Sequence, residues 1–515
     1  MKLQTADQPD LSSRTADRSR RAAPALECAA AFLLSLGLLF WIQFASPAII
    51  GKDAYYHIRW SRMLRASAPH LPAFTWLPLT VLRASDFVDQ HFLFHVLLMP
   101  FTFGDLRLGA KLAAPLFSAL AIASIFGLLV TYRVRYRWLW LLPLAAGSEP
   151  FLYRMSMTRD PSPSLVLLAV GVYLILERKF VPLAALTFVF VWLYNMFPLI
   201  LVFAFAYAVT IWLAERRFSF GALYATSIGA ALGLLINPYF PKDFLLIFHH
   251  LHMLLAETVA IDVGSEWYPF ETWEMLAGNV VLFAVCFAAL LAFDFRKRGS
   301  GLYLQPGQKS HDSRPLFFLL LAAVFLLMAL RWRRFFEYWP PFAVLFAAFT
   351  FDAEAGPESP LRVPPRLGIA AWLIVMGAFA IVNVRGARAE IRDTDDPSAM
   401  RGASAWLAGH TPPGSLIFNV DWAEFPELFY YNQQNAYVTG LDPRYLYDAN
   451  PELWKVYDSI TQGQEKHPGP IIRARFGAEY VVARSDSTDF LNVANASADF
   501  ETVYSDTYAS ILRVR

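Results

Sequence analysis

The chain has 515 residues, of which 56% are hydrophobic and 17% are charged, and its mean hydropathy is +0.39. Soluble proteins carry about 25% charged residues on average, so this composition excludes a chain of ordinary soluble domains. Acidic residues outnumber basic ones from Arg388 onward, and the opposite holds before it, within a net charge of +2. This balance argues against nucleic acid as a partner. Cys28 and Cys286 lie in apolar stretches, which excludes a disulfide framework and a cysteine-based zinc site.

The N-terminal residues 1–26 contain several arginines and are expected to form a cytoplasmic tail. An apolar run over 26–50 follows and is long enough to cross a bilayer. A cleaved signal peptide is the alternative interpretation, but the run is too long and has no clear small-x-small cleavage site. We therefore expect a retained first membrane helix.

Further apolar runs predict a membrane domain over 27–387. With the first run they make eleven expected spans, at 108–131, 138–152, 163–177, 180–195, 197–214, 218–236, 275–295, 315–331, 339–352 and 367–385. Arginine and lysine gather in alternate connectors, which places the N-terminus in the cytoplasm. An odd number of spans puts the C-terminal part outside, and an even number would put it inside. The segment 91–103 is expected to be a helix packed within the first outer loop.

Three long outer loops are predicted, over 51–107, 148–162 and 237–274. Together with the short segment 331–338 they carry arginines that the orientation rule does not expect outside. Charged residues beside membrane helices are costly and therefore mark functional sites.

The polar residues 388–515 predict a soluble α/β domain in the periplasm. Short β-rich runs lie at 415–420, 435–439, 479–483 and 510–514. The segments between them have helical spacing, and this alternation is typical of a small mixed sheet with helices.

Each long outer loop supplies one carboxylate: Asp53, Asp160 and Glu266. Such residues just beyond membrane helices suit a divalent-metal ligand or a general base. Asp53 and Asp160 could instead cap the helices that follow them, and Arg159 could pair with Asp160. His57 is a candidate for lining the same site.

Arg331, Arg333 and Arg334 lie where a span meets the outer side. Guanidinium groups there suit a phosphate or pyrophosphate. The alternative is that they anchor a helix end, with Glu337 pairing with one of them. The histidines within 249–252 have no acidic residue within one turn, so an interfacial helix explains them better than a metal site.

The order of these motifs resembles the catalytic subunit of oligosaccharyltransferases, which belong to the GT-C class of polytopic glycosyltransferases. The resemblance spans about 27–385. Its motifs are GKDAYYHIR at 51–59, PFLYRMSMTRD at 150–160, VGSE at 263–266 and RWRRFFEY at 331–338. The chain lacks the WWDYG motif of that family and has NVDWAEFP at 419–426 in the comparable place. Protein N-glycosylation is therefore not implied.

The resemblance implies a role for each matching residue. Asp53 would bind a divalent metal, Mg²⁺ or Mn²⁺, and engage the acceptor, with Asp160 as a second ligand and Glu266 as a further catalytic carboxylate. The donor phosphate would lie against arginines, namely Arg154, Arg331, Arg333 and Arg334. Asp421 and Trp422 would lie on the acceptor side. Only one aspartate remains of the family's paired metal-binding motif, at Asp160.

The resulting hypothesis is an inner-membrane glycosyltransferase of the GT-C class. It would transfer a sugar or glycan, with inversion, from a polyprenyl-phosphate or polyprenyl-diphosphate donor on the extracytoplasmic face. Membrane lipids would be its other partners, and the acceptor could be a lipid, a polysaccharide or a protein. A lipid or solute transporter and a non-catalytic cell-envelope assembly protein are the alternatives. Transporters favour charges near mid-bilayer in repeated halves, which this sequence does not show.

Overall fold

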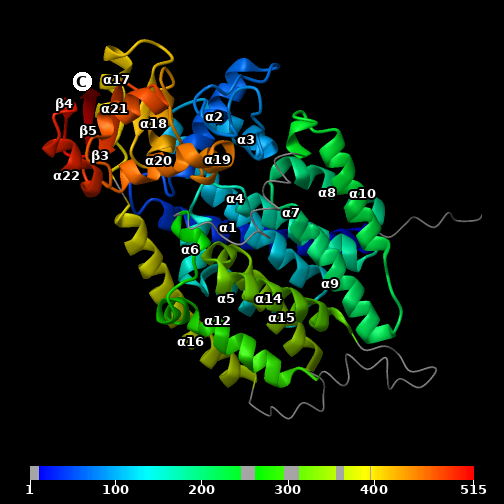
Figure 1. The fold of residues 1–515 in the computed structure, drawn as a ribbon. Coiled ribbons are helices and arrows are strands. Elements are labelled where there is room, and N and C mark those ends of the chain that lie inside the picture. The colour runs from blue at the N-terminus through cyan, green and yellow to red at the C-terminus, as the bar shows by residue number, and fades with distance from the viewer. Residues whose placement is uncertain (1–10, 245–260, 262, 295–311, 355–364, 395) are drawn as a thin grey trace, which may run out of the picture.

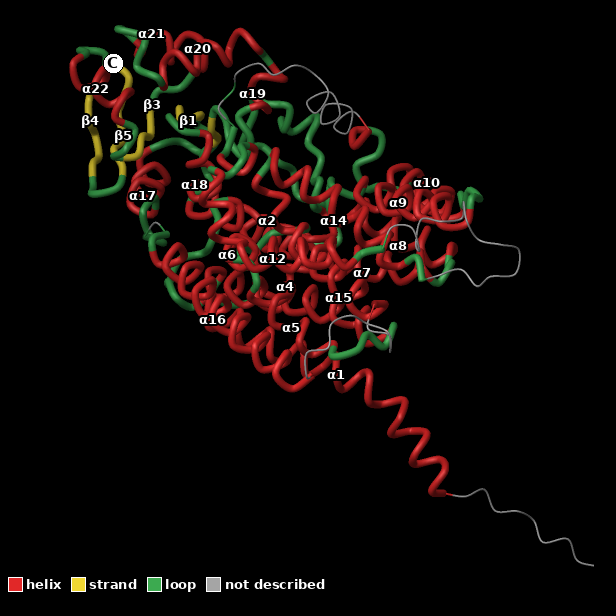
Figure 2. Tube along the Cα trace, turned by 90° about the horizontal axis from the view of Figure 1, so that it is seen from below, coloured by secondary structure: helices red, strands yellow, loops and turns green. Residues whose placement is uncertain are grey.

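The computed structural model describes residues 11–244, 261, 263–294, 312–354, 365–394 and 396–515. Helices dominate as far as Arg392, and a small sheet lies near the C-terminus (Figures 1 and 2). The helices of the first part are α1 (Leu11–Gln43), α2 (Asp53–Ser67), α3 (Phe92–Leu98), α4 (Leu106–Thr131), α5 (Arg137–Ala146), α6 (Glu149–Met155), α7 (Pro161–Leu176), α8 (Phe180–Leu193), α9 (Pro198–Glu215), α10 (Gly221–Leu235), α12 (Thr272–Ala292), α14 (Arg314–Arg331), α15 (Trp339–Glu354) and α16 (Pro365–Arg392). Short 3₁₀ helices are η1 (Met99–Thr102), η2 (Ser265–Trp267) and η3 (Arg333–Glu337).

Among the described residues, six helices are long and apolar enough to cross a bilayer. They are α1 from Ala23, α4, α9, α12, α14 and α16 from Arg366. Shorter apolar helices include α7, α8 and α10. Every apolar run expected from the sequence overlaps at least one described helix, and the count of eleven crossings stays a prediction.

The expected span at 138–152 is not one continuous helix. Helix α5 ends at Ala146, and the Ser148 side chain accepts a hydrogen bond from the Phe151 amide at 3.2 Å to begin α6. Serine is a preferred N-cap, and a proline in the first turn suits the start of a helix. Pro150 occupies that position in α6. Hydrophobicity predicted the run correctly but not the break within it.

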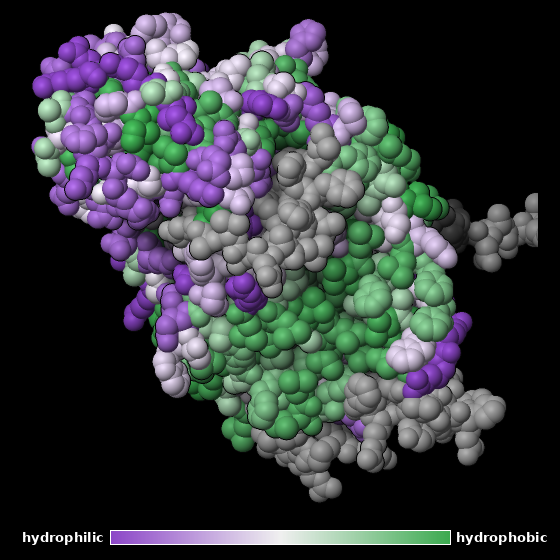
Figure 3. Space-filling view, in the orientation of Figure 1, coloured by the Kyte–Doolittle hydropathy of each residue, from purple (hydrophilic) through white to green (hydrophobic). Residues whose placement is uncertain are grey.

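The helical body has an apolar outer surface. Figure 3 shows hydrophobic residues over the exposed helical face and hydrophilic residues over the C-terminal part. Val181, Leu291 and Ile374 are 83%, 74% and 72% exposed on α8, α12 and α16. Contiguous apolar surface of this kind fits a hydrocarbon environment, in which helices satisfy their own backbone hydrogen bonds.

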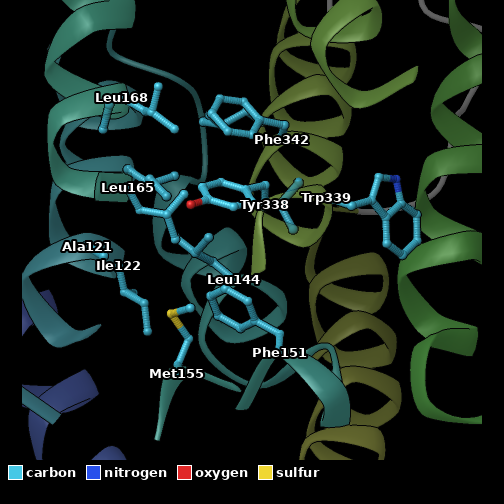
Figure 4. Close-up of a cluster of buried hydrophobic side chains, with 14 of the residues drawn as sticks. Ala121, Ile122, Leu144, Phe151, Met155, Leu165, Leu168, Tyr338, Trp339 and Phe342 are labelled. Carbon is cyan, nitrogen blue, oxygen red and sulfur yellow. The ribbon is translucent and has the colours of Figure 1, made fainter. Parts of the chain in front are cut away.

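Helix α15 lies at the centre of the packed helices. Every residue from Trp339 to Thr350 is buried, which is typical of a helix surrounded on all sides. Next to it, Tyr338 lies in a cluster of buried hydrophobic side chains (Figure 4). Its hydroxyl lies 2.9 Å from Ser164 Oγ of α7. This packing fixes η3, the segment that immediately precedes α15 and carries Arg333 and Arg334.

Lys111 links the end of α1 to α4. It is buried, and its Nζ donates to the carbonyl oxygens of Gln43 at 2.8 Å, Ser46 at 2.7 Å and Ala48 at 2.9 Å. The last turn of a helix leaves carbonyls without partners, and a cation there is favourable. The contact fixes the point from which the chain enters the first outer segment.

The C-terminal part contains a five-stranded sheet with the order β2-β1-β3-β5-β4. Its strands are β1 (Leu416–Asn419), β2 (Ala436–Tyr437), β3 (Tyr480–Arg484), β4 (Phe500–Ser505) and β5 (Ala509–Val514). Strand β1 pairs in parallel with β2 and β3, and β5 runs antiparallel to β3 and β4. The helices are α17 (Arg401–His410), α18 (Phe425–Tyr431), α19 (Arg444–Ala449), α20 (Pro451–Thr461), α21 (Pro468–Ile471) and α22 (Thr488–Ala496), with a π-helical turn at Ile472–Phe476. The sequence did not predict β4.

The segment after α1 and the C-terminal part share one hydrophobic core. Figure 1 shows α2 and α3 beside α18, and α2 packs against α18. Trp60 and Phe74 are buried in the same cluster as Phe425 and Phe429, and the Trp76 indole donates to the Gln433 carbonyl at 2.8 Å. The segment 51–107 and the C-terminal part therefore form a single layer over one end of the helices.

Candidate functional site

The three predicted carboxylates come from separate outer segments and lie on different elements. Asp53 is the first residue of α2, Asp160 precedes α7, and Glu266 lies in η2. Neither aspartate caps a helix with its side chain: Lys52 is the N-cap of α2, and Asp160 is the N-cap residue of α7 but its carboxylate makes no capping hydrogen bond. The capping alternative is therefore wrong for both, and their oxygens are available to other groups.

Arg159 brings two of these carboxylates together. Its Nη1 lies 2.7 Å from Glu266 Oε2, and its Nη2 lies 3.3 Å from Asp53 Oδ2. The sequence left open a pairing of Arg159 with its neighbour Asp160. In the structure, Asp160 Oδ1 lies 3.2 Å from His91 Nδ1. One planar guanidinium can bridge two carboxylates because its donors point in fixed, divergent directions.

Arg154 adds a further acidic residue, Glu337, to the same cluster. Its Nε donates to Glu337 Oε1 at 2.6 Å, and its Nη2 lies 3.2 Å from Glu266 Oε2. Glu337 is only 1% exposed. A buried carboxylate needs such a partner, so Arg154 is already engaged by two acidic groups. The helix-anchor alternative had paired Glu337 with an arginine of its own segment, and its partner is Arg154 of α6.

The three arginines at 331–334 differ in their surroundings. Arg334 is buried, lies 3.7 Å from Glu266 Oε1, and donates to the Tyr194 hydroxyl at 3.2 Å. Arg331 is exposed and its guanidinium lies over the Trp332 ring. Arg333 donates to the Pro269 carbonyl at 3.0 Å. The structure therefore places Arg334 in the cluster, whereas Arg331 and Arg333 contact groups outside it.

Burial and the arginines shift the pKa values of the carboxylates in opposite directions. Burial raises the pKa of Asp53, against the attraction of Arg159, and raises the pKa of Asp160 to about 6. Burial also opposes ionisation of Glu266, but Arg159, Arg334 and Arg154 outweigh it and hold the pKa of Glu266 well below its usual value. Environments that separate the pKa values of neighbouring carboxylates indicate different chemical roles. Glu266 is a fixed charge, and Asp53 is the more basic group.

His57 lies one helical turn after Asp53 on α2 and is buried. Its Nδ1 is 2.8 Å from Nε2 of His95 on α3. Its ring also lies against the ring of His91, with 5.4 Å between centroids. The predicted site residue His57 therefore borders the cluster but reaches it from the side of α3.

The described residues do not fit the expected divalent cation. No group of three or more acidic, histidine or cysteine side chains within the described ranges is arranged to hold a metal. The oxygens of Asp53 and Glu266 face Arg159 instead. Mg²⁺ and similar ions need several oxygen ligands around one point, so no step of the chemistry is assigned to a metal here. The histidines at 249–252 lie outside the described residues.

The two residues expected on the acceptor side have local contacts. Asp421 and Glu424 form a reciprocal capping box at the start of the 3₁₀ helix Trp422–Glu424, so the Asp421 carboxylate is used by the backbone. Trp422 packs over the 263–266 loop, since a Cβ on Gly264 would lie 3.3 Å from its ring. Trp422 thus covers the segment that carries Glu266.

Sequence reasoning missed several members of the cluster. Tyr194 lies in the short turn between α8 and α9, and an uncharged residue there gives no sequence signal of a functional site. Asp89 and His95 lie in an aromatic-rich stretch of the first outer loop, and an acidic residue six positions before a histidine there was the available signal.

Comparison with solved structures gives relatives in fold. The chain is similar to ArnT from Cupriavidus metallidurans in the apo state, with a TM-score of 0.56 and 14% identity over 95% of this chain and 98% of that one. It is also similar to the same protein bound to undecaprenyl phosphate, with a TM-score of 0.53, 15% identity and the same coverage. The arabinofuranosyltransferase AftD from Mycobacteria matches at a TM-score of 0.50 and 15% identity, over 94% of this chain and 41% of AftD.

No protein-family model matches the sequence, and no curated protein matches it either. The structural likenesses show that the chain shares its overall fold with ArnT and AftD. The narrower resemblance to the oligosaccharyltransferase catalytic subunit stays a prediction.

Proposed function

We propose that this protein is a multi-pass membrane glycosyltransferase that uses a polyprenyl-phosphate-linked or polyprenyl-diphosphate-linked sugar as donor. The observation that carries the proposal is the partly buried cluster in which Arg159 joins Asp53 to Glu266 while the buried Arg334 lies beside it. Phosphate recognition and proton removal need these residue types together. A fold similar to that of a protein bound to undecaprenyl phosphate supports this choice of donor.

Within the cluster, Arg334 is best suited to the donor phosphate. Its contact with Glu266 is long at 3.7 Å, and its hydrogen-bond partner Tyr194 is neutral. Arg154 is held between Glu337 and Glu266, so it orients Glu266 more than it attracts an anion. Negative charge increases on the leaving phosphate as its bond to the sugar breaks. A preorganised guanidinium stabilises that charge in the transition state.

Asp53 is the group that accepts the acceptor's proton. The acceptor oxygen forms a bond to the anomeric carbon, and the bond from that carbon to the phosphate oxygen breaks. The electron pair leaves with the polyprenyl phosphate, and the hydroxyl proton passes to the Asp53 carboxylate. A single displacement of this kind inverts the anomeric centre. The raised pKa of Asp53 makes it a stronger base than an ordinary aspartate.

We propose that the reaction takes place on the extracytoplasmic face of the inner membrane. Positive charge in alternate connectors and an odd number of spans would put the outer segments and the C-terminal part on that side. An apolar helical surface open to lipid gives a long isoprenoid tail a place to lie. The acceptor would be a lipid, a polysaccharide or a protein that the C-terminal part admits.

The test uses the full-length protein in inner-membrane vesicles with a panel of labelled undecaprenyl-phosphate sugars and an envelope extract as acceptor. Wild-type protein should transfer label and release undecaprenyl phosphate, and Asp53→Asn should lower the rate by about 100-fold or more. Asp421→Asn, which alters a capping group, is the matched control and should keep most activity.

Two results would overturn the proposal. One is that no donor in the panel loses its sugar and undecaprenyl phosphate does not bind to the purified protein. The other is label that crosses the membrane with its sugar–phosphate bond intact, which would indicate a transporter.

A further inference from the structure

Three buried side chains form a hydrogen-bonded chain that ends at His57. Both carboxylate oxygens of Asp89 lie close to His95 Nδ1, at 2.9 and 2.8 Å, and His95 Nε2 lies 2.8 Å from His57 Nδ1. Asp89, His95 and His57 are 5%, 0% and 5% exposed. Fully buried polar chains are costly unless every member is satisfied.

The acidic end of this chain is firmly placed. Asp89 Oδ2 accepts from the Trp60 indole at 2.9 Å, and Asp89 Oδ1 accepts from the His91 amide at 3.0 Å. Burial raises the pKa of Asp89, but His95 and these donors outweigh it, and the net pKa lies below the ordinary value. Asp89 is therefore an ionised acceptor.

The direction of the hydrogen bonds follows from the acidic end. A carboxylate can only accept, so His95 Nδ1 carries the proton that lies between them. With one proton on each ring, His95 Nε2 has a lone pair and accepts from His57 Nδ1. That leaves His57 Nε2 as the unprotonated nitrogen. Burial, with His95 and His91 nearby, holds the pKa of His57 well below its ordinary value, so this ring is neutral.

His57 lies on the face of α2 that carries Asp53, at the border of the candidate site. Nδ1 is the ring nitrogen with a hydrogen-bond partner among the described residues. His57 is one turn from Asp53, its ring contacts His91, and His91 lies 3.2 Å from Asp160. The positive charge of Arg159 also lowers the pKa of His57, after the larger effects of burial, His95 and His91. A hydroxyl held between Asp53 and His57 would meet two acceptors of different strength.

We propose that Asp89 and His95 are positioning residues that fix His57 in one tautomer, with Nε2 as the acceptor for the hydroxyl of the incoming acceptor molecule. This inference rests on the proposed function and assigns it a second contact with the nucleophile. Asp53 takes the proton, and His57 Nε2 accepts a hydrogen bond that orients the hydroxyl. Comparable chains elsewhere fix a histidine tautomer through a buried aspartate.

Two substitutions of His95 separate hydrogen bonding from packing. His95→Gln places a carbonyl oxygen near the former Nε2 and can accept from His57 without Asp89. His95→Phe keeps a planar ring of similar size but has no acceptor. We expect kcat to stay within about tenfold for His95→Gln and to fall by about 100-fold for His95→Phe, with the donor KM little changed. His70→Gln, which changes an exposed histidine of the same segment, is the matched control and should resemble wild type.

The tautomer itself is read by nitrogen NMR of histidine-labelled protein, with the His57 signals assigned by comparison with His57→Asn. In wild type, the chemical shift of His57 Nε2 should be that of an unprotonated ring nitrogen. In Asp89→Asn, the shifts of Nδ1 and Nε2 should either swap or become averaged between the two tautomers. This readout does not depend on sugar transfer, so it tests the chain even if no donor is used.

A protonated Nε2 in the wild-type protein would overturn the inference. So would equal activity of His95→Phe and wild type, or equal loss in His95→Gln and His95→Phe. Absence of transfer in wild type with the expected tautomer would instead count against the proposed function alone.

Discussion

Arg159 Nη1 lies 2.7 Å from Glu266 Oε2 and is the contact that joins the loop before α7 to the segment before α12. The same guanidinium lies 3.3 Å from Asp53 on α2. Three outer segments therefore depend on one side chain for their relative position. A charged residue in this place sets both the geometry and the protonation of the site.

Replacing Arg159 should abolish most transfer without unfolding the helical body. Arg159→Gln removes the bridge, so Asp53 and Glu266 would repel each other, and we expect kcat to fall by about 100-fold or more. Arg159→Lys keeps the charge but not the paired geometry and should lose about tenfold. Initial rates at saturating donor measure this. Equal rates for Arg159→Gln and wild type would show that the bridge has no part in the reaction.

Arg334 and Arg331 should differ in their effect on donor binding. Arg334→Gln should raise the dissociation constant for undecaprenyl phosphate by about tenfold, because it removes a buried guanidinium from the cluster. Arg331→Gln should change it by less than about twofold, because that residue is exposed on Trp332. Binding measured by calorimetry in detergent compares the two directly, and the opposite order would move the phosphate site out of the cluster.

Chelation tests how the negative charge of Asp53 and Glu266 is balanced. Since Arg159 contacts both carboxylates, we expect transfer to persist in the presence of a strong chelator. The rate is measured before and after chelation and again after addition of Mg²⁺ or Mn²⁺. Complete loss with recovery on adding one of these ions would favour the metal-assisted reaction expected from the family resemblance.

The C-terminal part should lose stability as pH rises because of Glu424. Burial, with Asp421 nearby, raises the pKa of Glu424 from 4.5 to about 8. The folded protein therefore holds a proton that the unfolded chain releases, so this stabilisation is complete below about pH 4.5 and is lost as pH rises through 8. Glu424→Gln cannot ionise and should be more stable than wild type at pH 9 by up to about 5 kcal/mol.

Thermal unfolding at pH 5 and pH 9 measures this difference. Glu452→Gln is the control, because Glu452 is exposed and its pKa is lowered by Lys455. Parallel pH dependence of wild type and Glu424→Gln would show that another group controls it.

The sequence indicated the positions of most helices because hydrophobic runs of span length leave few alternatives. The sequence also allowed Asp53, Asp160 and Glu266 to converge on one site, and the structure joins Asp53 and Glu266 through Arg159. Which arginine points inward could not be predicted. Arg331, Arg333 and Arg334 lie within four positions of one another. The rotation of η3 about its axis determines that Arg334 is the one that reaches Tyr194. The break at Gly147 and the capping role of Asp421 depend on local backbone geometry that hydrophobicity does not encode.

The hydrogen bond from Trp76 to Gln433 spans 357 positions of the chain. During biosynthesis, the first outer segment leaves the ribosome long before the residues that complete its hydrophobic core. Trp60 and Phe74 therefore stay exposed to solvent until translation is almost finished. Premature termination anywhere before Phe425 would leave that aromatic surface exposed, and quality-control proteases should remove such fragments even though their membrane helices are inserted.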